Sequence, residues 1–109
     1  MFAVSRRYKF DPAHSKQIDT EIAEFFVPMI QASPGFVAYY WINDGKGVGE
    51  SITVFETEMG AEASVKLAAM WSRIHKIINV QGVPEVMQGE VKAHAMGKTV
   101  RPTAAGAPA

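Results

Sequence analysis

The residues best suited to chemistry in this chain lie along one line of a predicted helix near its middle. The line repeats at spacings of four, three, four and three residues: Ser64, Ala68, Trp71, His75 and Ile78. Such spacings place side chains on one face of a helix. If this face borders a sheet, it offers an aromatic wall, a hydroxyl and a titratable imidazole in one cleft.

This arrangement would suit a pocket for a phenolic molecule. We expect His75 to be the catalytic base or hydrogen-bond donor, because an imidazole titrates near neutral pH. The expected substrate-binding residues are aromatic walls and polar contacts: Trp71, Tyr39, Tyr40, Ser64 and Asn43. The alternative is structural. Trp71 then belongs to the core, and His75 lies near a helix C-terminus, whose dipole favours the charged imidazole.

Other kinds of site are not expected. The three histidines, His14, His75 and His94, show no metal-ligand spacing, so we predict neither a metal site nor a cofactor. The glycines of residues 45–49 join strand to strand rather than opening a helix, which favours a hairpin over a phosphate site. The chain has no cysteine, which excludes disulfides and thiol chemistry and suits the cytoplasm.

The composition of the chain argues against two classes of binding partner, nucleic acids and membranes. The formal net charge is zero, and residues 46–49 lack the aromatic side chains of RNA-recognition strands, so we expect no nucleic-acid partner. No apolar run reaches the length of a membrane span, and charged residues interrupt the N-terminus, so we expect no membrane partner and no signal peptide. A length of 109 residues fits one domain.

The pattern of apolar residues predicts the elements in order. Asp11 is the expected N-cap of the first helix, with Ser15 as the alternative, and Pro28 should kink that helix or separate its last turn. Arg6 interrupts an apolar alternation and marks a rim or a pocket. The predicted elements are strand 2–10, helix 11–33, strand 36–43, hairpin 44–50, strand 51–56, helix 59–79 and strand 86–96.

This β-α-β-β-α-β order predicts an α+β fold of the ferredoxin-like type. Right-handed crossovers give a four-stranded antiparallel sheet with two helices on one face. We expect one domain over residues 1–96 and a disordered tail over residues 97–109, which are small, aperiodic and proline-containing.

The second strand predicts a partner subunit. Phe36, Ala38, Tyr40 and Ile42 point one way by strict alternation, and Val37, Tyr39 and Trp41 point the other. Both faces are apolar, although two helices cover only one. The simplest cover for the other is a second copy, packed sheet to sheet with two-fold symmetry. The alternative is an exposed aromatic patch for another ligand. Alternation does not say which face meets the helices.

Four stretches also resemble a known group: PGFVAYYWINDGKG, SITVFETEMGAEAS, KLAAMWSR and PEVMQGEV. They are similar to small bacterial proteins of the dimeric α/β barrel superfamily, and within it to antibiotic-biosynthesis-monooxygenase-like domains, over about residues 1–95. The resemblance implies a dimeric α/β barrel. It also implies cofactor-free oxygenation of phenolic or quinol substrates, in which the substrate anion supplies electrons to oxygen.

The same superfamily includes haem-degrading proteins. Their pattern is Asn on the first strand, Trp on the second helix and a ligating His about ten residues later. Trp71 fits, whereas Arg6 and Arg7 stand where Asn is expected and His75 follows Trp71 by only four residues. Three functions therefore remain: a cofactor-free monooxygenase, a non-enzymatic dimeric binding or interaction module, and a haem-binding or haem-degrading relative.

Overall fold

A computed structural model describes residues 1–74 and 84–97, with the backbone alone for residues 71–74. One antiparallel sheet of four strands runs in the spatial order β2-β3-β1-β4. Its strands are β1 (Phe2–Lys9), β2 (Phe36–Asn43), β3 (Val48–Phe55) and β4 (Glu85–Glu90). The predicted order and antiparallel pairing are confirmed.

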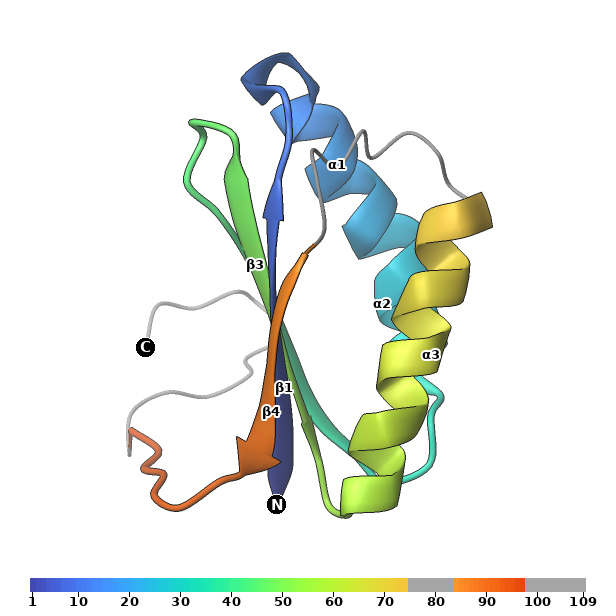
Figure 1. Cartoon of the computed structure of the whole chain (residues 1–109), viewed down its shortest axis with the longest axis vertical. Coiled ribbons are helices and arrows are strands. Elements are labelled where there is room, and N and C mark those ends of the chain that lie inside the picture. Colours follow the sequence, from blue (N-terminus) through green and yellow to red (C-terminus); the bar gives the residue numbers. More distant parts are fainter. Residues whose placement is uncertain (75–83, 98–109) are drawn as a thin grey trace.

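The helices form one layer on one side of this sheet, as Figure 1 shows. The first crossover consists of consecutive helical turns, and the second is a single long helix. These elements are η1 (Pro12–His14), α1 (Ser15–Glu21), η2 (Ile22–Phe26), α2 (Val27–Gln31) and α3 (Glu58–Ile74). The fold is thus ferredoxin-like. No helix in the described ranges has both the length and the apolarity needed to cross a membrane.

The first crossover begins as predicted, and its helix changes type just before Pro28. Asp11 caps its first turn, because its Oδ1 accepts a hydrogen bond from the backbone N–H of Ala13 at 2.9 Å. Of the two outcomes predicted at Pro28, the last turn is separate: α2 follows the π-helical turn η2, which is closed by a bond from the Val27 N–H to the Ile22 carbonyl. Pro28 has no amide hydrogen for the carbonyl four residues earlier, and the wider turn just before it accommodates that loss.

Two predicted boundaries differ from those in the structure. β4 ends at Glu90 rather than Met96, because Glu90 pairs with Phe2 at the start of β1 and little of β1 remains beyond it. The hairpin loop is shorter than predicted, since β3 already begins at Val48. Gly45 and Gly47 adopt the positive φ values that this tight turn requires. The predicted helix end near Asn79 and most of the predicted tail lie outside the described residues.

The predicted alternation of β2 is wrong at its first residue. Phe36 pairs with Phe55 and Ala38 with Val54, so Val37 is an extra residue in a β-bulge. Phe36 therefore shares the helix-facing side with Tyr39 and Trp41 instead of the outer side with Tyr40. Its ring meets Phe55 edge to face at 6.1 Å.

The core fills the space between this inner sheet face and the helices. Its fully buried members come from every layer: Val4 of β1, Ile18 of α1, Ile30 of α2 and Phe55 of β3. On β3, buried and half-buried residues alternate along the whole strand, as expected when one face meets a core and the other does not.

Candidate functional site

A small cavity lies inside the domain, between the sheet and the helix layer. Its volume is about 20 Å³, which is room for one water molecule. The lining combines apolar, aromatic, hydroxyl and guanidinium side chains: Val4, Arg6, Tyr8, Ile22, Phe26, Ile30, Tyr39, Trp41, Ser51, Thr53, Ser64 and Ala68. Polar groups in so enclosed a place need partners, and their partners define what the site can do.

The strand pleat turns the polar lining residues inward. On β3, Ser51 and Thr53 occupy the helix-facing positions and are 5% and 6% exposed. On β1, Arg6 is directly opposite Ser51 in the antiparallel register, and it therefore shares its face. Ser64 reaches the cavity from α3, where its Oγ donates to the Ala61 carbonyl at 2.6 Å.

Two tyrosines present their phenols to the same space. Burial raises the pKa of Tyr8, an effect that the charge and hydrogen bonding of Arg6 and the hydroxyl of Ser51 partly offset. Burial also raises the pKa of Tyr39 far above its ordinary value, with Tyr8 adding to the rise and Ser51 opposing it. Both phenols therefore stay protonated at neutral pH, and they serve as hydrogen-bond donors rather than as bases.

Arg6 is the cation of the cavity. Its Nη1 donates to the Val65 carbonyl of α3 at 3.1 Å, which connects β1 to the helix layer. Its Nε is buried and, among the described residues, has no hydrogen-bond partner. The Val65 carbonyl satisfies one donor of this partly buried guanidinium but supplies no negative charge.

The aromatic wall is built mainly by β1, β2 and the first crossover. Trp41 is 6.1 Å from Tyr8 between ring centroids, and Tyr39 is 5.4 Å from Phe26. The indole of Trp41 is fixed at its rim, because its Nε1 donates to Asp19 Oδ1 at 2.8 Å. This bond anchors β2 to α1 and holds the ring over the end of the cavity.

The structure brings some of the predicted site residues together and separates others. Tyr39 and Ser64 line the cavity, as does Ala68 from the same line of α3. Tyr40 lies on the opposite sheet face and is 60% exposed, so only one of the two tyrosines borders this space. Asn43 is not part of the lining, because its Nδ2 instead donates to Asp19 Oδ1 at 2.9 Å.

The two remaining predicted residues cannot be compared in the same way. The backbone of Trp71 belongs to α3, one turn after Ala68, but its side chain is outside the described part. His75 lies outside the described residues altogether. The catalytic role of His75 and the wall role of Trp71 therefore stay predictions.

Sequence reasoning missed several members of the lining. Arg6 is not among them, because its break in an apolar alternation marks it as a rim or pocket residue, and it lines the cavity. Ser51 and Thr53 alternate with Ile52 and Val54, a pattern typical of a strand whose polar side faces water. Here the polar side faces the cavity and the apolar side faces outward.

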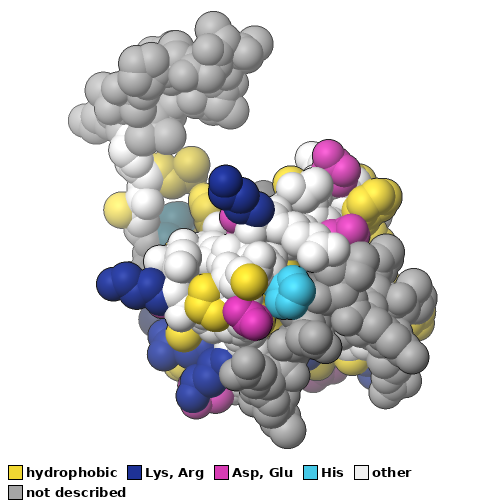
Figure 2. Space-filling view, turned by 90° about the horizontal axis from the view of Figure 1, so that it is seen from above, with side chains coloured by type: hydrophobic (Ala, Val, Ile, Leu, Met, Phe, Trp, Pro, Cys, Tyr) yellow, Lys and Arg dark blue, Asp and Glu magenta, His cyan; other side chains and the backbone are white. Residues whose placement is uncertain are grey.

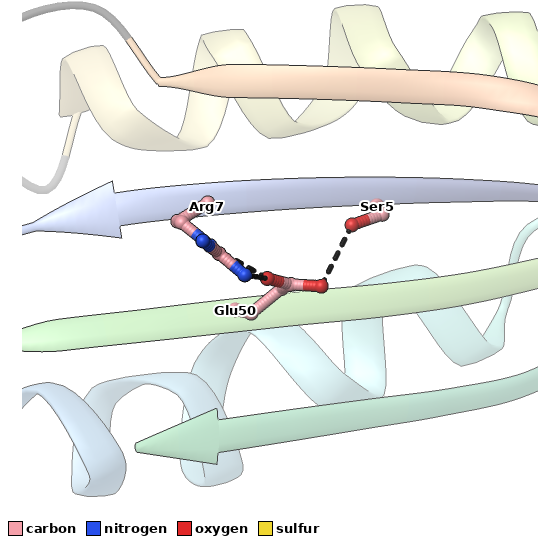
Figure 3. Close-up of polar contacts among 3 residues, drawn as sticks. All are labelled: Ser5, Arg7 and Glu50. Carbon is pink, nitrogen blue, oxygen red and sulfur yellow. Dashed lines mark hydrogen bonds and ion pairs between the residues drawn. The ribbon is translucent and has the colours of Figure 1, made fainter. Parts of the chain in front are cut away.

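The outer sheet face carries the polar cluster drawn in Figure 3. Arg7 donates through Nε to Glu50 Oε1 at 2.9 Å, and the Ser5 hydroxyl donates to Glu50 Oε2 at 2.9 Å. Apolar side chains lie on the same face, with Tyr40 60%, Ile42 54% and Met87 76% exposed. A face with this many uncovered apolar groups is typical of an interface.

The described surface also has an open groove of about 580 Å³ beside the start of α3, whose lining includes Pro34, Met59 and Leu67. Figure 2 views the end that carries η1 and the β2–β3 hairpin, where the coloured side chains mix charged, polar and apolar types. Within the described ranges, no group of three His, Asp or Glu side chains could hold a metal ion.

The comparisons with known proteins agree on the fold. At the level of sequence, neither a family model nor a curated protein matches the chain. A monooxygenase encoded by the gene ActVA-Orf6 of Streptomyces coelicolor, solved with the ligand nanaomycin D, is similar in structure. Its TM-score is 0.69 at 14% identity, over 88% of this chain and 91% of that one.

Two further structures are similar. The haem-degrading protein MhuD of Mycobacterium tuberculosis, solved with two haems in its active site, gives a TM-score of 0.66 at 14% identity, over 88% of this chain and 100% of the other. A dimeric ferredoxin-like protein from an uncultured marine organism gives 0.65 at 9% identity, over 89% and 100%. This chain therefore has the ferredoxin-like fold of the dimeric α/β barrel, monooxygenase-like proteins.

Proposed function

We propose that this protein binds a small aromatic molecule between its sheet and its helices and acts on it as a cofactor-free monooxygenase. The observation that carries the proposal is the buried cavity, where aromatic walls surround a guanidinium and several hydroxyl groups. The similar monooxygenase, solved with nanaomycin D, supports the assignment by its shared fold.

In the proposed oxygenation, the substrate itself supplies the electrons, so the protein needs no redox cofactor. A phenol that becomes a quinone supplies all the electrons that dioxygen accepts: one oxygen atom enters the ring as a carbonyl, and the other leaves as water with two substrate hydrogens. The protein must take up the phenolic proton and stabilise the resulting anion. Arg6, Tyr8 and Tyr39 are the donors for that anion, and His75 is the proposed base.

The size of the cavity limits this function. A volume of about 20 Å³ admits one water molecule, so a ring enters only when the sheet and helices move apart. The cost of opening weakens the apparent affinity, because only the open fraction of molecules binds. This observation also favours the second candidate, a non-enzymatic dimeric module whose interior aromatics are core.

We also propose that the outer sheet face pairs with a second copy of the chain. Tyr40, Ile42 and Met87 are exposed on a face that no helix covers (Figure 1). The fold is shared with a protein solved as a dimer, and a self-complementary sheet face satisfies two-fold symmetry. A homodimer would bury the apolar groups that the isolated domain exposes.

The deciding experiment is a thermal-shift screen with quinols, polycyclic phenols, flavins and haemin, followed by oxygen-uptake assays on whatever binds. A ligand at about a hundred times its dissociation constant adds about 2.7 kcal/mol to stability. Selective stabilisation by one class of phenol, with oxygen uptake, supports the monooxygenase. Stabilisation by haemin with a Soret shift favours a haem-binding relative instead. A flat screen favours the non-enzymatic module.

A further inference from the structure

The charge of Arg6 has no counter-charge among the protein's own carboxylates. The chain has 11 Asp and Glu residues, and the sequence places every one of them within the described ranges. None of these side chains lines the cavity. In the described part of the chain, the arginine that forms an ion pair is the next one, Arg7, and it does so with Glu50 on the opposite sheet face (Figure 3).

The geometry around Arg6 leaves donor capacity unused. One terminal nitrogen is bound to the Val65 carbonyl, while the buried Nε has no partner among the described residues. Arg6 is partly buried, and an anion in the cavity would give its unpartnered Nε a charge-assisted hydrogen bond that no carboxylate of the described residues supplies. An oxyanion suits this group, because the fork of guanidinium N–H donors matches two anionic oxygens.

The other polar groups around the cavity point to the same kind of ligand. Tyr8 and Tyr39 keep their protons at neutral pH because burial raises the pKa of both phenols. The hydroxyls of Ser51 and Thr53 stand on the facing positions of β3. A lining with one cation, several O–H donors and no carboxylate is complementary to an anion that only accepts hydrogen bonds.

We propose that the cavity recognises an aromatic acid, whose anionic oxygen pairs with the guanidinium of Arg6 while its ring lies against the aromatic wall. The inference rests on the proposed function, since it names the charge of the molecule that the same cavity binds. The anionic oxygen comes either from a carboxylate or from an ionised phenol. Arg6 thereby determines specificity for charged over neutral rings.

The test is a calorimetric titration with matched pairs of ligands. 2-Naphthoate is compared with its neutral isostere 2-naphthamide, and 4-nitrophenolate with 4-nitroanisole. We expect the charged member to bind about tenfold more tightly or better in at least one pair, as a charge-assisted bond should allow. The pair that discriminates identifies the source of the anion.

Variants show whether Arg6 is the cause. Arg6→Met should abolish the preference for the acid and leave binding of the neutral ring in place. Arg6→Lys should retain a weaker preference, which keeps the test usable if Arg6→Met does not fold. Lys9→Met removes a positive charge from an exposed position of the same strand and should retain the full preference.

Stability of the ligand-free protein gives a second readout. Replacing this partly buried cation, which lacks a counter-charge, by an apolar side chain should leave the melting temperature unchanged or raise it. A lower melting temperature with the acid preference intact would make Arg6 a purely structural link to Val65 and overturn the inference. Equal binding of acids and neutral rings would overturn it while the proposed function stands. If no aromatic probe binds, the proposed function fails as well.

Discussion

Gly49 of β3 lies directly beneath the indole of Trp41 on β2. A Cβ built on Gly49 would be 2.3 Å from Cη2 of Trp41, far closer than any real contact. The absence of a side chain at this position is therefore what lets the indole lie flat over the strand and reach Asp19. The position of Trp41 in the cavity wall thus depends on the absence of a side chain at Gly49.

Gly49→Ala should displace Trp41 and lower the free energy of unfolding by about 1–3 kcal/mol, because the extra methyl group overpacks a rigid site. Urea unfolding followed by tryptophan fluorescence measures both effects. Gly89→Ala is the matched control, since Gly89 is also a strand glycine and a Cβ there meets nothing within 4 Å. Equal effects of the two substitutions would contradict the close contact.

Phe26→Ala should enlarge the cavity and let a single aromatic ring bind without opening the domain. The substitution removes a buried ring and should cost about 3–5 kcal/mol of stability. Indole or benzene should then raise the melting temperature of the variant more than that of the wild type. Met59→Ala, at a 79% exposed position of α3, should show neither change. Loss of stability without ligand binding would show that removing the Phe26 ring does not create room for a ligand in the cavity.

Glu50→Gln should lower the free energy of unfolding at neutral pH, because it removes the charge that Arg7 and Ser5 contact on the outer sheet face. Hydrogen bonds from Arg7 and then Ser5 hold the pKa of Glu50 below its ordinary value of 4.5. A lowered folded-state pKa stabilises the protein above the unfolded pKa, and this contribution disappears as pH falls through the folded value. The wild type should exceed the variant by up to about 1 kcal/mol near neutral pH, and the difference should vanish in acid.

Urea unfolding at two pH values measures that difference. Glu62→Gln, at an exposed position of α3, removes the same charge from another element and is the matched control for the Glu50 substitution. A difference that persists in acid would mean that Glu50 acts through packing rather than through its charge.

Tyr40→Glu should convert the proposed dimer into a monomer, because it places an unpaired charge in an apolar interface. Light scattering coupled to size-exclusion chromatography measures the change in mass. Met59→Glu, at a 79% exposed position of α3 away from the outer sheet face, should leave the mass unchanged. A monomeric wild type would refute the dimer, and the exposed face would then need another partner.

His75→Ala should abolish turnover with little loss of stability if His75 is the base of the proposed reaction. Oxygen uptake with the substrate found in the screen measures the effect. His94→Ala, at an exposed position of the C-terminal segment, is the control. Unchanged turnover in the His75 variant would remove it from the mechanism.

The sequence was sufficient to predict the fold because its periodicities are local. β2 has the predicted bounds, and Asp11 caps the first crossover as expected. Features that depend on a partner element were not predictable. The end of β4 is set by where β1 begins, and the π-helical turn before Pro28 is a response to packing that several turn types could satisfy.

The site was predicted in part for the same reason. Helical spacing groups Ser64 with Ala68, and both line the cavity, because i and i+4 neighbours share a face whatever they pack against. Alternation could not choose between Tyr39 and Tyr40, since it defines two faces without saying which one meets the helices. Ser51 was missed because polar residues at alternate positions of a strand ordinarily indicate a face exposed to solvent.

The bulge at Val37 has a consequence for how this protein tolerates changes in chain length. Elsewhere in β2, deleting one residue would turn every residue between the deletion and one strand end to the opposite face of the sheet. Residues of the cavity wall would then face outward, and residues of the outer surface would face the cavity. At Val37, a one-residue deletion would restore regular pairing between Phe36–Ala38 and Val54–Phe55 and leave Tyr39 and Tyr40 on their present sides. Natural length variation within this strand should therefore be confined to that position.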